Sequence, residues 1–185
     1  MKKLLFLFTL TILVMGMAWA QGLETFENHN LSGTSYVNGS FTGNNDITWN
    51  YVQVTGEQSY PIDNKGILLR RSDAPSKVYS STIIGGIGNF SVQMRKAFTS
   101  TGDRQVALYI NDTFIANSQT FGSASGADAT IHTFSVENIN IAGNIVIEIR
   151  HITGGSSNRQ LVIDNLSWTG YSGGTPTVAT PNISP

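Results

Sequence analysis

Apolar and polar residues alternate along much of this chain, and this alternation is the strongest constraint on its fold. Residues 90–95, 106–110 and 145–150 show it most clearly. A period of two is typical of strands with one buried face, because successive side chains point to opposite sides. No window after the first twenty residues sustains the 3.6-residue repeat of a capped amphipathic helix. The pattern therefore predicts an all-β domain.

Clusters of Gly, Asn, Ser and Asp separate the predicted strands. They lie at residues 43–46, 85–88, 123–126 and 154–157. Asn111-Asp112 is predicted to be the turn of a β-hairpin that returns over residues 113–116. The other predicted strands cover residues 24–26, 48–54, 66–70, 78–83, 130–136 and 160–168. About nine short strands at this spacing predict an antiparallel two-sheet β-sandwich of the jelly-roll type, with a closed barrel as the alternative.

The beginning of the chain has the features of a secretory signal. Lys2 and Lys3 precede an uncharged apolar stretch from Leu4 to Met17, and Ala18-Trp19-Ala20 forms a small-x-small cleavage site. The apolar stretch is shorter than the roughly 20 residues of a membrane span, although an uncleaved anchor is the alternative. Residues 1–20 are predicted to be a signal peptide. The mature chain is then extracellular or at the cell surface, with no membrane span.

The C-terminal segment, residues 172–185, is rich in Gly, Thr and Pro and lacks the alternation of the preceding residues. Such residues bury too little apolar area to fold alone, so the segment is predicted to be an extended linker to further domains of the same polypeptide. Residues 21–171 remain as one β-sandwich domain, a common size for a single core.

The composition excludes several kinds of chemistry. The chain has no Cys, which excludes a disulfide scaffold, a thiolate zinc site and a cysteine nucleophile. Without Lys2 and Lys3, 9 of the 11 basic residues remain against 12 acidic ones, which disfavours a general polyanion binder. The sequence holds no nucleophile-elbow, phosphate-loop or zinc-protease motif. His29, His132 and His151 lack metal-ligand spacing and are predicted to be solvated or at sheet edges. No catalytic residue is predicted.

Four acidic residues outside turns are candidates for function: Glu24, Glu27, Glu148 and Asp164. Two of them could form a glycosidase pair, which needs carboxyl groups about 5 to 10 Å apart. The first and last strands of a jelly roll are often neighbours, which would bring Glu24 and Glu27 near Asp164. Carboxylate oxygens suit Ca²⁺, so these three residues predict a structural calcium site. The alternative is that the glutamates are surface acids and Asp164 binds backbone amides of a loop.

A polar strand face is the candidate binding surface. Arg95, Glu148 and Arg150 point away from the apolar residues of their strands, and Tyr109 does so in the hairpin. If these strands are neighbours, their side chains suit sugars, because planar groups stack on pyranose rings and charged groups bond to hydroxyls. An ordinary cross-strand salt-bridge ladder is the alternative. Trp49 and Tyr51 share a face and are predicted to be core, with a stacking platform as the alternative.

Residues 60–70, 85–98 and 162–168 resemble an accessory β-sandwich module of secreted Bacteroidota-type multidomain proteins. In that group the module accompanies extracellular nucleases, lamin-tail domains and C-terminal sorting signals. Residues 178–185 also resemble the opening strand of the fibronectin-like repeats of chitobiase-type proteins. The resemblance implies a non-catalytic module of a larger exported protein and transfers no catalytic residue.

These features predict a non-catalytic extracellular module that binds carbohydrate, either a polysaccharide or a surface glycan. The predicted ligand-binding residues are Arg70, Arg95, Tyr109, Glu148 and Arg150. One alternative is an accessory domain of a nuclease that contacts nucleic-acid phosphates through Arg70, Arg71, Arg95 and Lys96, with steep salt dependence. Another is a structural spacer or adhesion domain without a small ligand.

Overall fold

A computed structural model describes residues 21–57, 59–71, 76–153, 158–173 and 182–184, and the predicted signal peptide lies outside these ranges. The strands of the described residues are β1 (Gly22–Glu24), β2 (Val37–Thr42), β3 (Thr48–Gly56), β4 (Ile67–Leu69), β5 (Lys77–Ser80), β6 (Phe90–Lys96), β7 (Val106–Ile110), β8 (Thr113–Asn117), β9 (Ile131–Val136), β10 (Ile147–His151), β11 (Leu161–Trp168) and β12 (Asn182–Ser184). One 3-10 turn, η1 (Asn44–Asp46), precedes β3. Within the described ranges, no helix has the length and apolar character to span a membrane.

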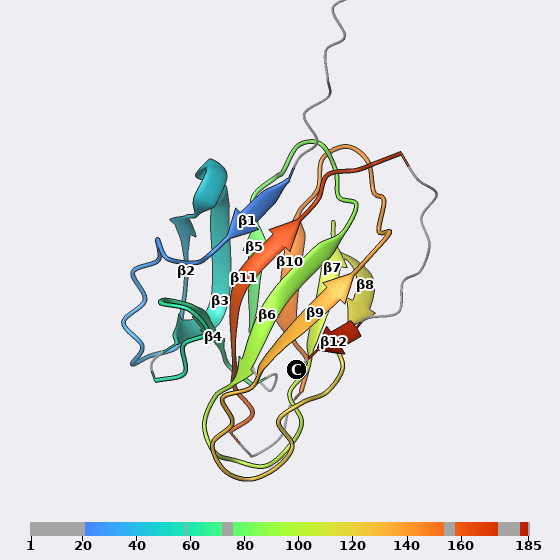
Figure 1. Ribbon diagram of the computed structural model, residues 1–185. Helices are drawn as coiled ribbons and strands as arrows, with labels where there is room; N and C mark the ends of the chain where they lie inside the picture. Colours follow the sequence, from blue (N-terminus) through green and yellow to red (C-terminus); the bar gives the residue numbers. More distant parts are fainter. Residues whose placement is uncertain (1–20, 58, 72–75, 154–157, 174–181, 185) are drawn as a thin grey trace, which may run out of the picture.

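The strands form two packed layers (Figure 1). The front layer has the order β12-β9-β6-β11, with β1 and β4 both paired to the remaining edge of β11. The back layer has the order β2-β3-β5-β10-β7-β8. All of these pairings are antiparallel, which confirms the predicted β-sandwich of the jelly-roll type. Strands β12 and β8 end the strand order and do not pair with each other in the described residues, so the closed-barrel alternative is wrong.

Strand β3 belongs to both layers. Residues 49–52 pair with β5 in the back layer, and residues 54–56 pair with β4 in the front layer. Strand β3 carries one extra residue against β2 at this transition, and Gln53 takes a positive φ of 51° there. A bulge of this kind bends a strand, and it lets β3 pass from one sheet to the other.

The core between the layers comes from the inward positions of the alternating strands. Strand β6 shows the pattern in full, with burial at every second residue from Phe90. Phe26, Trp49 and Trp168 pack edge-to-face, with ring centroids 5.8 and 6.5 Å apart. The prediction that Trp49 is a core residue is confirmed, and the stacking-platform alternative for it is wrong because the residue is fully buried. Tyr51 is only partly buried and packs against this core.

A loop covers one half of the outer face of the front layer and leaves the other half bare. Tyr60 and Ile62 of this loop pack on Leu68 and Val162. The guanidinium of Arg95 holds the loop in place by donating to the carbonyl oxygen of Pro61. The bare half, towards the C-terminal end of β11, is where a ligand can reach the sheet.

Replacing Asp112 by Gly is expected to stabilise the protein by about 0.5 kcal/mol. Asn111 and Asp112 both take positive φ, at 51° and 60°, which confirms the predicted hairpin and favours Gly at the second position. The exposed pair of Asp112 with Arg150, at 3.7 Å, contributes less than this gain. Denaturant unfolding checks the prediction. Asp112→Ala is the control, and equal stability of the Gly and Ala variants would contradict the backbone argument.

Candidate functional site

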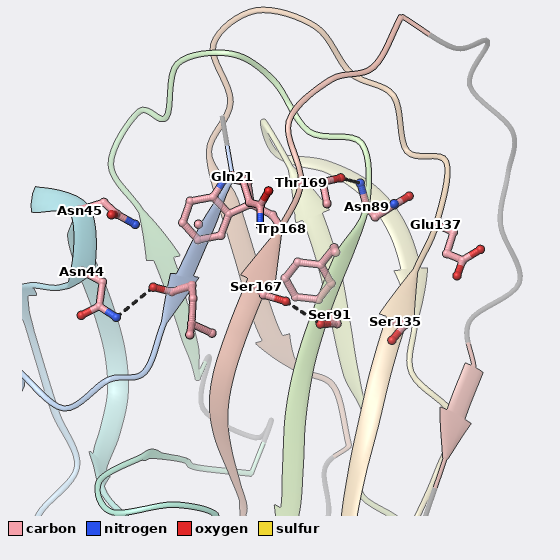
Figure 2. A pocket seen from close by; sticks show the side chains of 13 residues that line it. Gln21, Asn44, Asn45, Asn89, Ser91, Ser135, Glu137, Ser167, Trp168 and Thr169 are labelled. Atoms are coloured by element: carbon pink, nitrogen blue, oxygen red, sulfur yellow. Dashed lines mark hydrogen bonds between the residues drawn. The ribbon is translucent and has the colours of Figure 1, made fainter. Parts of the chain in front are cut away.

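A groove of about 940 Å³ crosses the bare half of the front layer (Figure 2). It is lined by Gln21, Gly22, Leu23, Asn44, Asn45, Asn89, Phe90, Ser91, Ser135, Glu137, Ser167, Trp168 and Thr169. Asn44 and Asn45 of η1 lie at one end, and Ser135 and Glu137 lie at the other. The long direction of the groove therefore runs across the strands.

Small side chains explain why the sheet is hollow here. Ser167, Ser91 and Ser135 occupy adjacent cross-strand positions on β11, β6 and β9, and Leu23 of β1 continues the row. A serine side chain rises little above the backbone, so three in a row leave a depression. The hydroxyls of Ser91 and Ser167 lie 2.8 Å apart and bond to each other. The floor is thus uncharged and carries hydroxyl groups.

The end of the groove at η1 is held by a buried carboxylate. Glu24 accepts hydrogen bonds from the backbone amides of Asn44, at 2.8 Å, and Phe26, at 2.7 Å. The side-chain amide of Asn44 donates to the carbonyl oxygen of Leu23 at 2.9 Å. Burial raises the pKa of Glu24, and the two backbone amides oppose that rise. The role of Glu24 in this structure is to fix η1 against β1.

The opposite wall is held by Asn89. Its side-chain oxygen accepts a hydrogen bond from the backbone amide of Asn138 at 2.8 Å. Its own backbone amide donates to the hydroxyl of Thr169 at 2.9 Å. Trp168 packs beneath with 4% of its surface exposed, and its indole N–H has no hydrogen-bond partner among the residues that the structure describes. Backbone and side-chain hydrogen bonds thus hold both walls of the groove in place.

The lining suits an uncharged polar ligand. Its described residues supply amide groups, hydroxyl groups, the side chain of Leu23 and the edges of two aromatic rings, and Glu137 is the one charged side chain among them. Amides and hydroxyls both donate and accept hydrogen bonds, as sugar hydroxyls require. No Lys or Arg is among the lining residues, so the groove offers no cation to a phosphate.

Three of the five predicted binding residues come together on the outer face of the back layer. Glu148 lies between Tyr79 and Tyr109 in one cross-strand row. Arg150 pairs with Glu148 and stacks 3.8 Å from the centroid of the Tyr109 ring. Lys77 lies 2.9 Å from the Glu148 carboxylate. Lys77 and Arg150 thus already pair with a carboxylate of the protein, and Arg150 also stacks on a ring, as in the cross-strand salt-bridge ladder. Ligand binding at Tyr109, Glu148 and Arg150 stays a prediction.

The expectation that Arg95 shares this face is wrong, because β6 belongs to the front layer. Arg70 lies just after β4, where it donates to the side chain of Gln53 at 2.7 Å and stacks on Tyr36 at 5.4 Å. Lys96, named above as a phosphate contact, points inward and donates to the carbonyl oxygen of Ala124. Arg95 and Lys96 are consecutive in a strand, so they cannot face the same side.

The three predicted calcium ligands are only partly brought together. Strand β1 pairs with β11, as predicted. Glu27 accepts from the backbone amide of Lys65 at 3.0 Å, and Asp164 accepts from those of Asn165, at 2.7 Å, and Asp63, at 3.2 Å. Glu24 turns instead towards η1. In the part of the chain that the structure describes, no three Asp, Glu or His side chains gather to hold a metal ion. The expected three-acid cluster is therefore wrong as a preformed set.

Asp164 is fully buried, and this burial raises its pKa to about 6. The nearby charges of Glu27 and Asp63 raise the pKa further, and the two backbone amides oppose the shift. Burial therefore makes the ionised form of this carboxyl unfavourable.

Two of the three histidines differ from their predicted positions. His29 and His151 are buried rather than solvated. The Nδ1 atom of His29 accepts from the amide of Leu31 at 3.2 Å, so its Nε2 donates to the carbonyl oxygen of Gly66 at 2.9 Å. His132 stacks on Phe121, and burial lowers its pKa. His29 thus holds a loop to the sheet.

Comparisons with known proteins give a likeness of fold only. No family model matches the chain, and no curated protein matches it. Among solved structures, it is similar to the CBM36-1 domain of a multidomain xylanase from the hindgut metagenome of Trinervitermes trinervoides. That match has 17% identity and a TM-score of 0.46, and covers 82% of this chain and 98% of that chain.

Two further matches are of the same kind. One is carbohydrate-binding module CBM36 in complex with calcium and xylotriose, with 17% identity, a TM-score of 0.45, and coverage of 80% of this chain and 98% of that chain. The other is a family 35 carbohydrate binding module from Clostridium thermocellum, with 17% identity, a TM-score of 0.43, and coverage of 71% and 97%. Likeness at this level does not identify a ligand. The resemblance to Bacteroidota-type modules stays a prediction.

Proposed function

We propose that this chain is a non-catalytic carbohydrate-binding module and that the groove of the front layer holds the glycan. The observation that supports this most is the lining of the groove, which combines amides, hydroxyls and aromatic edges without a cation. A sugar presents the matching groups, namely hydroxyls on its edges and C–H bonds on its faces.

Two features favour binding over the alternatives. Glycoside hydrolysis uses a pair of carboxyl groups, whereas the groove lining contains Glu137 alone. None of Glu24, Glu27, Glu148 and Asp164 lines the groove. A nucleic-acid role would need clustered cations, and Lys96 and Arg95 are committed to the carbonyl oxygens of Ala124 and Pro61.

The wider setting of the proposal comes from the sequence. A signal peptide over residues 1–20 and a linker over residues 172–185 fit an accessory module of a larger secreted protein. A structural calcium ion is part of the proposal, with Glu27 and Asp164 as its ligands. The support for it is the full burial of the Asp164 carboxyl and the nearby charge of Glu27.

Replacing Ser91 by Tyr is expected to abolish glycan binding, with an affinity loss of at least about a hundredfold. The larger side chain would fill the middle of the groove, where Ser91 lies between Ser135 and Ser167. Isothermal titration calorimetry against a panel of soluble polysaccharides measures the effect. Ser40→Tyr makes the same change on the exposed edge strand β2 and should bind as the parent does. Binding by the parent that survives in the Ser91 variant would refute the groove as the site.

A further inference from the structure

A second cavity of about 320 Å³ adjoins the groove at its η1 end. The two cavities share Gln21, Asn45 and Trp168, so they are neighbouring compartments of one cleft. The second compartment is lined in addition by Asp46, Ile47 and residues 81–84. Ile84 lies on its rim with 78% of its surface exposed, which offers an apolar contact to a ligand that extends beyond the groove.

The cleft is long enough for several sugar units. The row from Leu23 through Ser167 and Ser91 to Ser135 crosses four strands, a span of about 14 Å at the usual strand spacing. The second compartment adjoins this row at Gln21, Asn45 and Trp168. A ligand that fills the groove is therefore an extended chain lying across the strands.

The charged side chains that line this cleft are both carboxylates. Glu137 lines the groove at the end next to Ser135, and Asp46 lines the second compartment (Figure 2 shows the position of Glu137). Among the lining residues that the structure describes, these are the only charged ones. Both are exposed, and neither forms an ion pair with any residue that the structure describes. An uncharged stretch thus lies between two unpaired carboxylates.

We infer that this cleft selects uncharged polysaccharides and rejects acidic ones, with Glu137 and Asp46 as the specificity-determining residues. This inference rests on the proposed function. A carboxylate or sulfate on an acidic glycan would meet a like charge at either end of the cleft, with no cation among the described lining residues to offset it. The repulsion therefore lowers the affinity for acidic glycans and leaves the affinity for neutral ones unchanged. Because both acids are exposed, salt should weaken the repulsion.

The test compares neutral and acidic forms of the same backbone. The probes are hydroxyethyl and carboxymethyl derivatives of cellulose, β-1,3-glucan and xylan, titrated into the mature chain by calorimetry. For a backbone that binds, the hydroxyethyl form should bind about tenfold more tightly than the carboxymethyl form at low ionic strength. The difference should shrink in moderate salt, and it should nearly vanish in the double variant Glu137→Gln/Asp46→Asn. Asp103→Asn removes an exposed acid that lines neither compartment and should leave the difference unchanged.

The outcomes separate the inference from the function it rests on. Equal binding of the hydroxyethyl and carboxymethyl forms overturns charge selection while glycan binding stands. A difference that persists in the double variant overturns the assignment to Glu137 and Asp46. Failure of every polysaccharide to bind the parent chain overturns the proposed function and the inference together.

Discussion

Arg104→Ala is expected to lose at least about 4 kcal/mol of folding free energy, a large part of the stability of an ordinary domain. Arg104 is fully buried, and the five N–H groups of its guanidinium donate to six backbone carbonyl oxygens, three of which share the two hydrogens of Nη2. The acceptors belong to Ala97, Ser100, Gly102, Gly122, Asn158 and Gln160. One side chain thus joins three chain segments, and its removal leaves these carbonyls without a buried donor.

Arg104→Lys keeps the variant measurable if the Ala form does not fold. A lysine has one ammonium group and cannot reach six acceptors, so a loss of about 3 kcal/mol and a fall in the melting temperature of about 10 °C are expected. Arg150→Lys makes the same substitution at a partly exposed ion pair and should cost less than about 1 kcal/mol. Denaturant unfolding of the parent, Arg104→Lys and Arg150→Lys provides the measurement. Similar losses of stability for Arg104→Lys and Arg150→Lys would contradict the role of Arg104 in joining these three segments.

The second large effect is a pH dependence that Asp164 imposes on stability. Its pKa is about 6 in the folded chain against 3.8 as the ordinary value. Because folding raises this pKa, its stabilising contribution is full below about pH 4 and is lost as the pH rises through about 6. The loss amounts to about 3 kcal/mol at neutral pH. The stability of Asp164→Asn relative to the parent should therefore rise by about that amount between pH 4 and pH 7.

Urea unfolding across this pH range measures the difference between the two chains, in which the other titrating groups cancel. Asp112→Asn, at an exposed turn, should show no such trend. Calcium gives a second measurement, since an ion on the ionised carboxyl would offset its burial. Calcium should then raise the melting temperature more at neutral pH than at pH 5, and magnesium should not. A calcium shift that survives in Asp164→Asn would contradict Asp164 as a ligand.

The fold could be predicted because local patterns determine it. Alternation in residues 90–95 places Val92 and Met94 in the core whatever the neighbouring strands are, and Asn111-Asp112 fixes its hairpin by backbone conformation alone. Strand β2 was not predicted, because Val37–Thr42 lies mostly exposed at a sheet edge and shows no alternation. Strand β12 lies within a segment predicted to be a linker.

The groove could not be predicted in the same way, because it depends on register between strands distant in sequence. Ser91, Ser135 and Ser167 are each an ordinary outward residue, and only the pairing of β6 with β9 and β11 makes them neighbours. The layer of Arg95 was wrongly predicted for the same reason, because the alternation shows that its side chain points outward but not which strands lie beside β6. Asn44 and Asn45 were interpreted as a turn, although they also form one end of the groove. Outward serines near the same end of several strands were the available signal.

The double membership of β3 bears on how the molecule comes apart. Backbone hydrogen bonds run from β5 through β3 to β4, so neither sheet can slide or peel away without breaking main-chain bonds in the other. Amide protons of both sheets should consequently exchange with solvent deuterium through one shared opening event of equal free energy.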